Sequence, residues 1–298
     1  MPFFSIIIPT YNRACIIRRP IDSIIAQTFT DWELIIVDDG STDHTQEIVD
    51  SYNDSRIKYI WQENQERSAA RNHGITLATG IWLCFQDSDD EYLPEHLQVL
   101  FEGIQAFPEY KIIRTGLHIY ENERYIGKSG IESMNKYDQF PYDSIQVFTF
   151  HSSILEYNQF EVNYFNAEDL HFLLKIGLNN ALKIINQLTG IHHYDPKSSG
   201  GVGFNYEKNL TNRRACLEDI LVWNNFLILP SLRRKRCLIE ILILYGHIKY
   251  KPENILSSLL ENLKILCRFP IEYVKLILKI IYVKIGEFSG FYRTLDRF

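Results

Sequence analysis

The chain has 298 residues, 46% of them hydrophobic and 23% charged, which suffices for one large folded domain, or a domain with a smaller appendage, and excludes a disordered, collagen-like or coiled-coil protein. The net charge of −6 is unevenly spread, because residues 231–298 carry 13 Lys and Arg against 6 Asp and Glu. Residues 1–230 are therefore strongly acidic, which argues against a nucleic-acid-binding groove, since such a groove needs concentrated Lys and Arg.

The first hundred residues alternate apolar runs with segments of helical period, a pattern typical of strands joined by crossover helices in a parallel sheet. The expected strands cover residues 3–8, 33–37, 57–61 and 82–86. The expected helices cover about residues 13–27, 45–52 and 68–78, and Pro20 should kink or break the first. Ligands of such sheets bind beyond the carboxyl ends of the strands. We therefore look for the site there.

The remaining pattern predicts further elements and two parts of the chain. We expect a helix at about 94–106, a strand at 111–115, a hairpin at 117–127, a helix at 167–176 and short strands at 181–188 and 190–194. Residues 200–203 are predicted to form a loop, and residues 198–201 are a candidate lid. The change in charge predicts a first domain at residues 1–230, with halves at about 1–105 and 106–230. Residues 231–298 form a basic, amphipathic helical region.

Acidic residues follow two of the predicted strands and should meet at one rim of the sheet. Asp87, Asp89 and Asp90 repel one another, and Mg²⁺ or Mn²⁺ bound to a diphosphate would neutralise them. An Asp-rich turn that caps the next helix is the alternative explanation. The second acidic strand end, Asp38-Asp39, favours the metal, and so does the lack of a Gly-rich phosphate loop or Walker lysine.

Four motifs in order resemble the family 2 glycosyltransferases with a GT-A fold. They are FSIIIPTYN at 4–12, IIVDDGSTD at 35–43, SAARN at 68–72 and DSDD at 87–90. The resemblance is dense over about residues 3–105, thinner to about 200 and absent beyond. It implies a GT-A, Rossmann-like α/β fold with a mainly parallel sheet flanked by helices. Residues 1–230 would then be the catalytic domain, with a nucleotide-binding half at about 1–105 and an acceptor half at about 106–230. The resemblance also implies an inverting, metal-dependent transferase that uses a nucleotide-diphosphate sugar, which we expect to be UDP-linked.

The resemblance also assigns residues to the donor. Pro9, Thr10 and Tyr11 would border the base, with Tyr11 stacked on it, and Asp38 or Asp39 would accept a hydrogen bond from the base imide. The alternative role for these two aspartates is an N-cap of the next helix, which we expect Asp43 to serve instead.

Further donor and metal contacts are carried over in the same way. Arg71 would lie near the base or the phosphates, with a surface salt bridge as its alternative role. Asp87 and Ser88 would face the ribose or the metal, and Asp89 would ligate the metal directly.

Inverting transfer is a single displacement that needs a base beside the acceptor hydroxyl. Glu168-Asp169 resembles the acidic motif of the family, so Asp169 is assigned as the base and Glu168 as an acceptor-binding neighbour, and an exchange of the two roles stays open. Helix N-terminal charge without a catalytic role is the alternative. Of His192 and His193 only one can face the site, because side chains alternate along a strand. We assign His193 as a third metal ligand, while His192, or a surface role for either, stays open.

Location and partners are expected as follows. Five scattered cysteines without a CxxC pair indicate a reducing, cytoplasmic setting, and the short apolar run at the N-terminus is not a signal peptide. Residues 231–298 form either a helical cap or a peripheral contact with anionic lipid at the inner face of the membrane. The resemblance implies a saccharide or lipid-linked acceptor in cell-surface polysaccharide or glycolipid synthesis. A catalytically silent nucleotide-sugar-binding or scaffold protein is the alternative, and a nucleotidyltransferase is a weaker one.

Overall fold

The structure is a computed structural model that describes residues 1–129, 144–164, 168–177, 180–194 and 215. The chain divides into two compact units, Met1–Phe204 and Asn205–Phe298. All elements given below belong to the first unit. The predicted loop at 200–203, the candidate lid at 198–201 and the basic region at 231–298 lie outside the described residues, so the domain boundary at residue 230 stays a prediction.

The N-terminal half forms the expected parallel sheet. Its elements are β1 (Phe4–Thr10), α1 (Arg18–Ile25), β2 (Trp32–Asp38), α2 (Thr45–Asp50), β3 (Ile57–Trp61), α3 (Glu66–Leu77) and β4 (Trp82–Phe85). These four strands lie in the order β3-β2-β1-β4 and are parallel. Thr10, Asp38 and Trp61 pair across the sheet, so the carboxyl ends of three strands meet at one rim.

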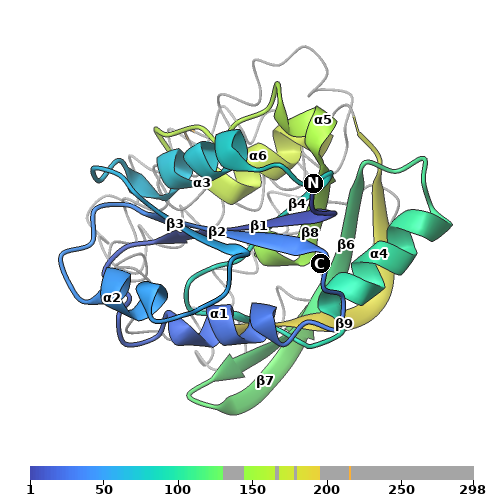
Figure 1. The fold of residues 1–298 in the computed structure, drawn as a ribbon. Helices are drawn as coiled ribbons and strands as arrows, with labels where there is room; N and C mark the ends of the chain where they lie inside the picture. The colour runs from blue at the N-terminus through green and yellow to red at the C-terminus, as the bar shows by residue number, and fades with distance from the viewer. Residues whose placement is uncertain (130–143, 165–167, 178–179, 195–214, 216–298) are drawn as a thin grey trace, which may run out of the picture. The chain divides into compact units, whose positions relative to one another are not determined.

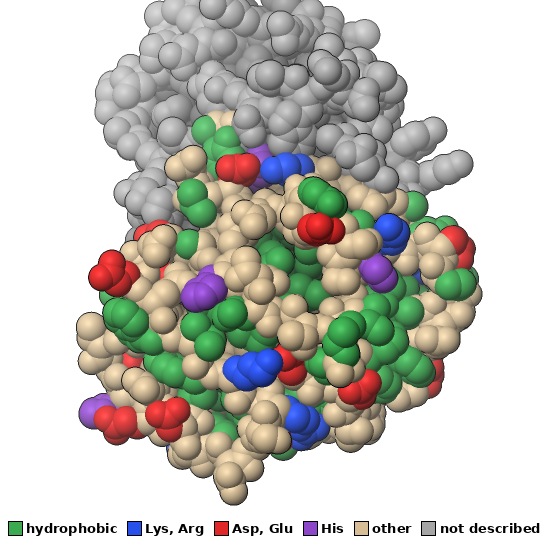
Figure 2. All heavy atoms as spheres, turned by 45° about the horizontal axis from the view of Figure 1, so that its top comes forward, with side chains coloured by type: hydrophobic (Ala, Val, Ile, Leu, Met, Phe, Trp, Pro, Cys, Tyr) green, Lys and Arg blue, Asp and Glu red, His purple; other side chains and the backbone are tan. Residues whose placement is uncertain are grey.

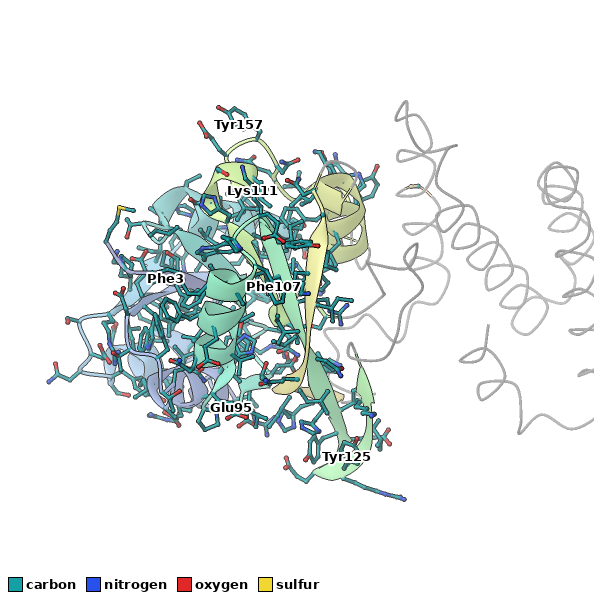
Figure 3. All side chains as sticks on the ribbon, turned by 90° about the vertical axis from the view of Figure 1, so that its right-hand side faces the viewer. Phe3, Glu95, Phe107, Lys111, Tyr125 and Tyr157 are labelled. Atoms are coloured by element: carbon teal, nitrogen blue, oxygen red, sulfur yellow. The ribbon has the colours of Figure 1, made fainter. Side chains whose placement is uncertain are left out.

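The second half completes a mixed sheet. Its elements are β5 (Glu91–Tyr92), α4 (His96–Ala106), β6 (Ile112–Glu121), β7 (Arg124–Ser129), a 3-10 helix (Ile145–Val147), β8 (Phe148–His151), α5 (Ser152–Leu155), α6 (Glu168–Gly177) and β9 (Leu182–Tyr194). The order continues β4-β8-β6-β9-β5, and β8 is antiparallel to both of its neighbours. The hairpin of β6 and β7 extends beyond the sheet, with the half-exposed Tyr125 at its far end (Figure 3).

Helix α1 and strand β9 differ from the predicted elements, and so does β6, which joins the strand expected at 111–115 to the first arm of the hairpin expected at 117–127. Helix α1 begins at Arg18 rather than near residue 13, so Pro20 lies in its first turn, where its missing N–H removes no hydrogen bond and causes no kink. The two short strands expected at 181–188 and 190–194 are one strand, β9, because register shifts in its pairing with β6 allow it to continue.

Helices cover both faces of the sheet, α1 and α2 on one and α3 and α6 on the other (Figure 1). One apolar cluster joins Phe4, Ile6 and Ile8 of β1 to α1 and α4. The opposite cluster joins Ile7 and Phe85 to the aromatic residues of α6 and β8. A Cβ on Gly74 would lie 2.4 Å from the side chain of Ile7, so α3 packs this close to β1 only with glycine there.

None of the helices described above is both long and apolar enough to cross a lipid bilayer. On the face that Figure 2 shows, acidic and basic side chains are interspersed with apolar ones over the described residues. No patch of one charge therefore marks a binding site on this face of the described residues.

Candidate functional site

The loops after β1 and β2 are tied together at the rim. The backbone N–H of Asp39 donates to the carbonyl of Thr10 at 2.8 Å. Asn12, at φ 52°, accepts the backbone N–H of Thr42 at 2.8 Å through its side-chain oxygen. The Thr10 hydroxyl is buried without a hydrogen-bond partner among the described residues, while Tyr11 is 48% exposed. Tyr11, whose ring is predicted to stack on the base, thus lies in a loop that is held by hydrogen bonds, and its side chain is accessible to solvent.

The two aspartates after β2 have different surroundings. Both carboxylate oxygens of Asp38 are engaged, one by the backbone N–H of Ser41 at 2.7 Å and the other by the Tyr59 hydroxyl at 2.6 Å. Within the described part of the chain, Asp39 accepts through Oδ1 alone, from Gln62 and from the backbone N–H of Gln65. Asp38 therefore shapes the loop, and Asp39 is the better placed of the two to accept from a bound base.

Asp43 contacts the start of α2 but is not its N-cap, which is the next residue, His44. The Asp43 carboxylate accepts the backbone N–H of Thr45, the first residue of α2, at 3.0 Å. It also accepts the backbone N–H of Ala14 at 3.0 Å, which fixes the segment before α1.

The acidic turn after β4 divides into exposed and buried carboxylates. Asp87 and Asp89 are 28% and 30% exposed. Asp87 accepts from Arg71 at 2.9 Å and from the Ser144 hydroxyl at 3.2 Å. Asp89 lies 4.0 Å from the nearest nitrogen of Arg13. Burial raises the pKa of Asp89 and the neighbouring Asp87 adds to this rise, so a bound cation would relieve a real electrostatic cost.

The third carboxylate of the turn, Asp90, is fully buried and has a structural role. It lies 2.9 Å from Nδ1 of His192 and accepts the backbone N–H of His193 at 2.8 Å. Burial raises its pKa to about 7, although the hydrogen bond and charge of His192 oppose the rise. These contacts attach the acidic turn to β9.

The two histidines of β9 have different partners in the structure. As expected for a strand, only one of them faces the acidic turn, and it is His192. Burial lowers the pKa of His192, but the hydrogen bond to Asp90 and the charges of the nearby aspartates outweigh burial and raise it to about 9. The ring of His193 points to the other side, where Nε2 lies 2.6 Å from Glu91. His192 is therefore the histidine that contacts the acidic turn through its ring, and the assignment of His193 as a third metal ligand stays a prediction.

The protein would supply only part of the coordination shell of a metal ion, and the substrate would have to supply further ligands. Among the described residues, no group of three or more His, Cys, Asp or Glu side chains is arranged to hold a metal ion. The exposed carboxylates of Asp87 and Asp89 nevertheless fit Mg²⁺ or Mn²⁺, because these ions often take one or two carboxylates and complete their shell with water and phosphate oxygens.

The acidic pair at the start of α6 lies close to the acidic turn, on the other side of Arg71. Glu168 is buried and lies 3.3 Å from Nη1 of Arg71 and 3.5 Å from Nη1 of Arg67. Asp169 is 27% exposed, and its Oδ1 accepts from Nη1 of Arg71 at 2.8 Å. Burial raises the pKa of Asp169 to about 7, with Arg71 opposing the rise and Glu168 and Asp87 adding to it. A carboxylate with this pKa suits a general base near neutral pH.

Sequence reasoning missed several residues that shape the site. Ser144 contacts Asp87, Tyr59 engages Asp38, and Phe160 lies under the guanidinium of Arg71, with 5.2 Å between Cζ and the ring centroid. Tyr59 had a usable signal, since it lies in a predicted strand beside the one that ends at Asp38. Ser144 and Phe160 come from segments without a periodic pattern.

Comparisons with known proteins agree with this fold. The family model described as glycosyl transferase family 2 matches residues 5–159, more than half of the chain. The Campylobacter jejuni GalNAc(5)-diNAcBac-PP-undecaprenol beta-1,3-glucosyltransferase is 38% identical over 106 residues, which is 34% of either chain. The chain spans at most half the length of the curated relatives it matches.

Two solved structures share the fold. S. aureus TarS 1-349 in complex with UDP-GlcNAc has a TM-score of 0.65 at 21% identity, covering 93% of this chain and 80% of that one. The mannosyltransferase PcManGT from Pyrobaculum calidifontis in complex with GDP-Man and Mn²⁺ has a TM-score of 0.60 at 15% identity, covering 96% and 87%. These likenesses confirm the GT-A type α/β fold with its mixed sheet. With the match to the family model, they show that the chain belongs to glycosyl transferase family 2.

Proposed function

We propose that the protein is an inverting glycosyltransferase that moves a sugar from a UDP-linked donor to an acceptor hydroxyl. The observation that carries the proposal is the pair of partly exposed carboxylates after β4, Asp87 and Asp89, close to a third partly exposed carboxylate, Asp169, at the start of α6. The first pair suits a metal-bound diphosphate, and the third suits the removal of a proton. Structures of the same fold that bind UDP-GlcNAc and GDP-Man support this assignment.

The donor base would lie on the loops after β1 and β2. Tyr11 offers an exposed ring for stacking, next to Pro9 and Thr10. Asp39 accepts from the base imide, while Asp38 holds the loop in shape. Ser88, between the two exposed aspartates, would face the ribose or the phosphates.

Asp89 and Asp87 would hold Mg²⁺ or Mn²⁺ together with the donor diphosphate. The bound ion would stabilise the negative charge that grows on the leaving diphosphate. His192 contacts Asp90 and thereby fixes the turn that carries both aspartates. The protein itself thus supplies two oxygen ligands and a rigid support for them.

The acceptor hydroxyl attacks the donor sugar while Asp169 takes its proton. The acceptor hydroxyl oxygen forms a bond to the anomeric carbon, the bond from that carbon to the diphosphate oxygen breaks, and the diphosphate keeps the electron pair. The hydroxyl proton passes to Asp169. Arg71 engages Oδ1 of this carboxylate, and no hydrogen bond from a described residue reaches Oδ2, which we assign as the atom that takes the proton. Glu168 is buried against Arg71, which favours Asp169 over Glu168 as the base.

A saccharide or lipid-linked acceptor fits the named activity of the Campylobacter relative, whose printed substrate carries a PP-undecaprenol group. The excess of basic residues in 231–298 supports peripheral contact with anionic lipid at the cytoplasmic face of a membrane. We therefore place the reaction in the synthesis of a cell-surface polysaccharide or glycolipid.

Calorimetric titration of UDP and UTP, with and without Mn²⁺, tests the proposal. We expect UDP binding that requires Mn²⁺ and is lost in Asp89→Ala. The matched control is Asp31→Ala. It removes an exposed aspartate just before β2, at the amino end of the strand and therefore at the end opposite the rim. Asp89→Ala with unchanged UDP affinity in Mn²⁺ would refute the metal assignment, and a preference for UTP would indicate a nucleotidyltransferase.

A further inference from the structure

Arg71 is buried between carboxylates that come from distant parts of the chain. Its side chain is 2% exposed. Nη2 lies 2.9 Å from Asp87, which follows β4, and Nη1 lies 2.8 Å from Asp169 and 3.3 Å from Glu168, at the start of α6. One guanidinium therefore joins the carboxylate on the donor side to the proposed base.

The guanidinium has no exposed edge to offer a ligand. Its Nε is buried and has no hydrogen-bond partner among the described residues, and the ring of Phe160 lies against its face. Both terminal nitrogens are directed at carboxylates of the protein. Arg71 therefore acts through Asp87 and Asp169 rather than by direct contact with the base or the phosphates.

The next residue on α3 supports the same arrangement. The side chain of Asn72 exchanges two hydrogen bonds with the backbone of Phe160, at 2.9 Å and 2.8 Å. Phe160 stacks on Phe172 of α6, with 3.9 Å between ring centroids and 7° between planes. Two adjacent residues of α3 thus position α6, Arg71 through charge and Asn72 through Phe160.

We propose that Arg71 is a positioning residue that orients Asp169 and couples it to Asp87. The proposal rests on the function proposed above. It depends on the planar fork of arginine, whose two ends reach carboxylates on opposite sides at once. A lysine ammonium keeps the charge but is a single point and cannot span both groups.

Arg71→Lys separates positioning from donor binding. We expect kcat for sugar transfer or donor hydrolysis to fall about 10²-fold, the cost of displacing a catalytic group by roughly 1 Å. The Kd for UDP with Mn²⁺ should change by a smaller factor than kcat, because Arg71 pairs with Asp87 while Asp89, the other proposed metal ligand, lies beside Arg13. Arg56→Lys is the matched control, because Arg56 pairs with Asp54 and stacks on Trp32 at 3.6 Å without a contact to the rim, and it should leave both quantities unchanged.

A double-mutant cycle tests whether Arg71 acts through the base. In the Asp169→Asn background, Arg71→Lys should change kcat by less than about twofold. Losses that multiply would overturn the proposal, and so would an Arg71→Lys variant that weakens UDP binding while kcat is retained. A wild-type protein that binds UDP but turns over no donor would instead contradict the proposed function.

A measurement on the unaltered side chain covers the case in which Arg71→Lys does not fold. In a protein with ¹⁵N-labelled arginine, a guanidinium held at both ends should show separate, slowly exchanging Nη proton signals. Asp169→Ala should shift the signals on the Nη1 side and speed their exchange, because only Glu168, at 3.3 Å, then remains near Nη1 among the described residues. Averaged signals in the wild-type protein would overturn the coupling, whether or not the protein transfers sugar.

Discussion

The most informative prediction concerns the pH dependence of catalysis through Asp169. Burial raises the pKa of this carboxyl to about 7, Arg71 and Arg67 oppose the rise, and Glu168 and Asp87 add to it. A general base must be ionised, so activity should be lost as the pH falls through this value. The ionised fraction is about 0.9 at pH 8 and about 0.1 at pH 6, so kcat/KM should fall about tenfold between them.

Initial rates of UDP release at low donor concentration, from pH 5.5 to 8.5, measure this limb, because kcat/KM reports groups of the free enzyme. Glu168→Gln removes a negative charge beside Asp169, so the midpoint should move to lower pH. Glu161→Gln removes an exposed carboxylate that pairs with Lys175, and it should leave the midpoint in place. Asp169→Asn should lower the rate by about 10²–10⁴ and abolish the limb. A flat wild-type profile, or the same limb in Asp169→Asn, would refute the assignment of the base.

Three further predictions test the scaffold and the tail. Burial raises the pKa of Glu33, but hydrogen bonds from Lys58, Ser5 and Thr79 outweigh burial and lower it from 4.5 to about 2. Glu33 therefore contributes about 3 kcal/mol of stability above pH 4.5 that is lost as the pH falls towards 2, so urea unfolding of Glu33→Gln should show a lower stability at pH 7 and a shallower loss in acid. A Cβ on Gly80 would lie 2.6 Å from the backbone nitrogen of Ser5, so Gly80→Ala should cost about 1–3 kcal/mol in the same assay, and an unchanged midpoint would contradict this contact. If residues 231–298 bind lipid, the protein should sediment with anionic vesicles and be released by salt, and Gln at positions 233–236 should weaken this binding at about 1 kcal/mol per charge. No sedimentation, with a loss of solubility on deletion of the tail, would indicate a helical cap instead.

The parallel half of the fold could be predicted because β1, β2 and β4 are buried on both faces and, like the partly exposed β3, read as short apolar runs. Their carboxyl ends carry the polar motifs, so Thr10, Asp38 and Asp87 could be assigned to one rim. The antiparallel insertion of β8 between β4 and β6 had no such signal, since strand order in that half depends on contacts across long separations.

The candidate site likewise has features that could be predicted from the sequence and others that could not. The acidic motifs could be identified, but the link through Arg71 joins residues 16 and 98 positions apart and follows no periodicity. Alternation along a strand predicted that one of the two histidines faces the acidic turn. The choice of His192 depends on how β9 is placed against β5 and β6, which the local pattern does not encode.

Release of nucleoside diphosphate from nucleotide sugars tests the central claim most directly. The purified protein is incubated with Mn²⁺ and a panel of UDP- and GDP-linked sugars, and the released diphosphate and the anomeric configuration of the product are measured. We predict release from a UDP-linked sugar, inversion at the anomeric carbon, and loss of release in Asp169→Asn. A wild-type protein that binds UDP but releases no diphosphate from any donor would contradict the account, as would release that Asp169→Asn leaves unchanged.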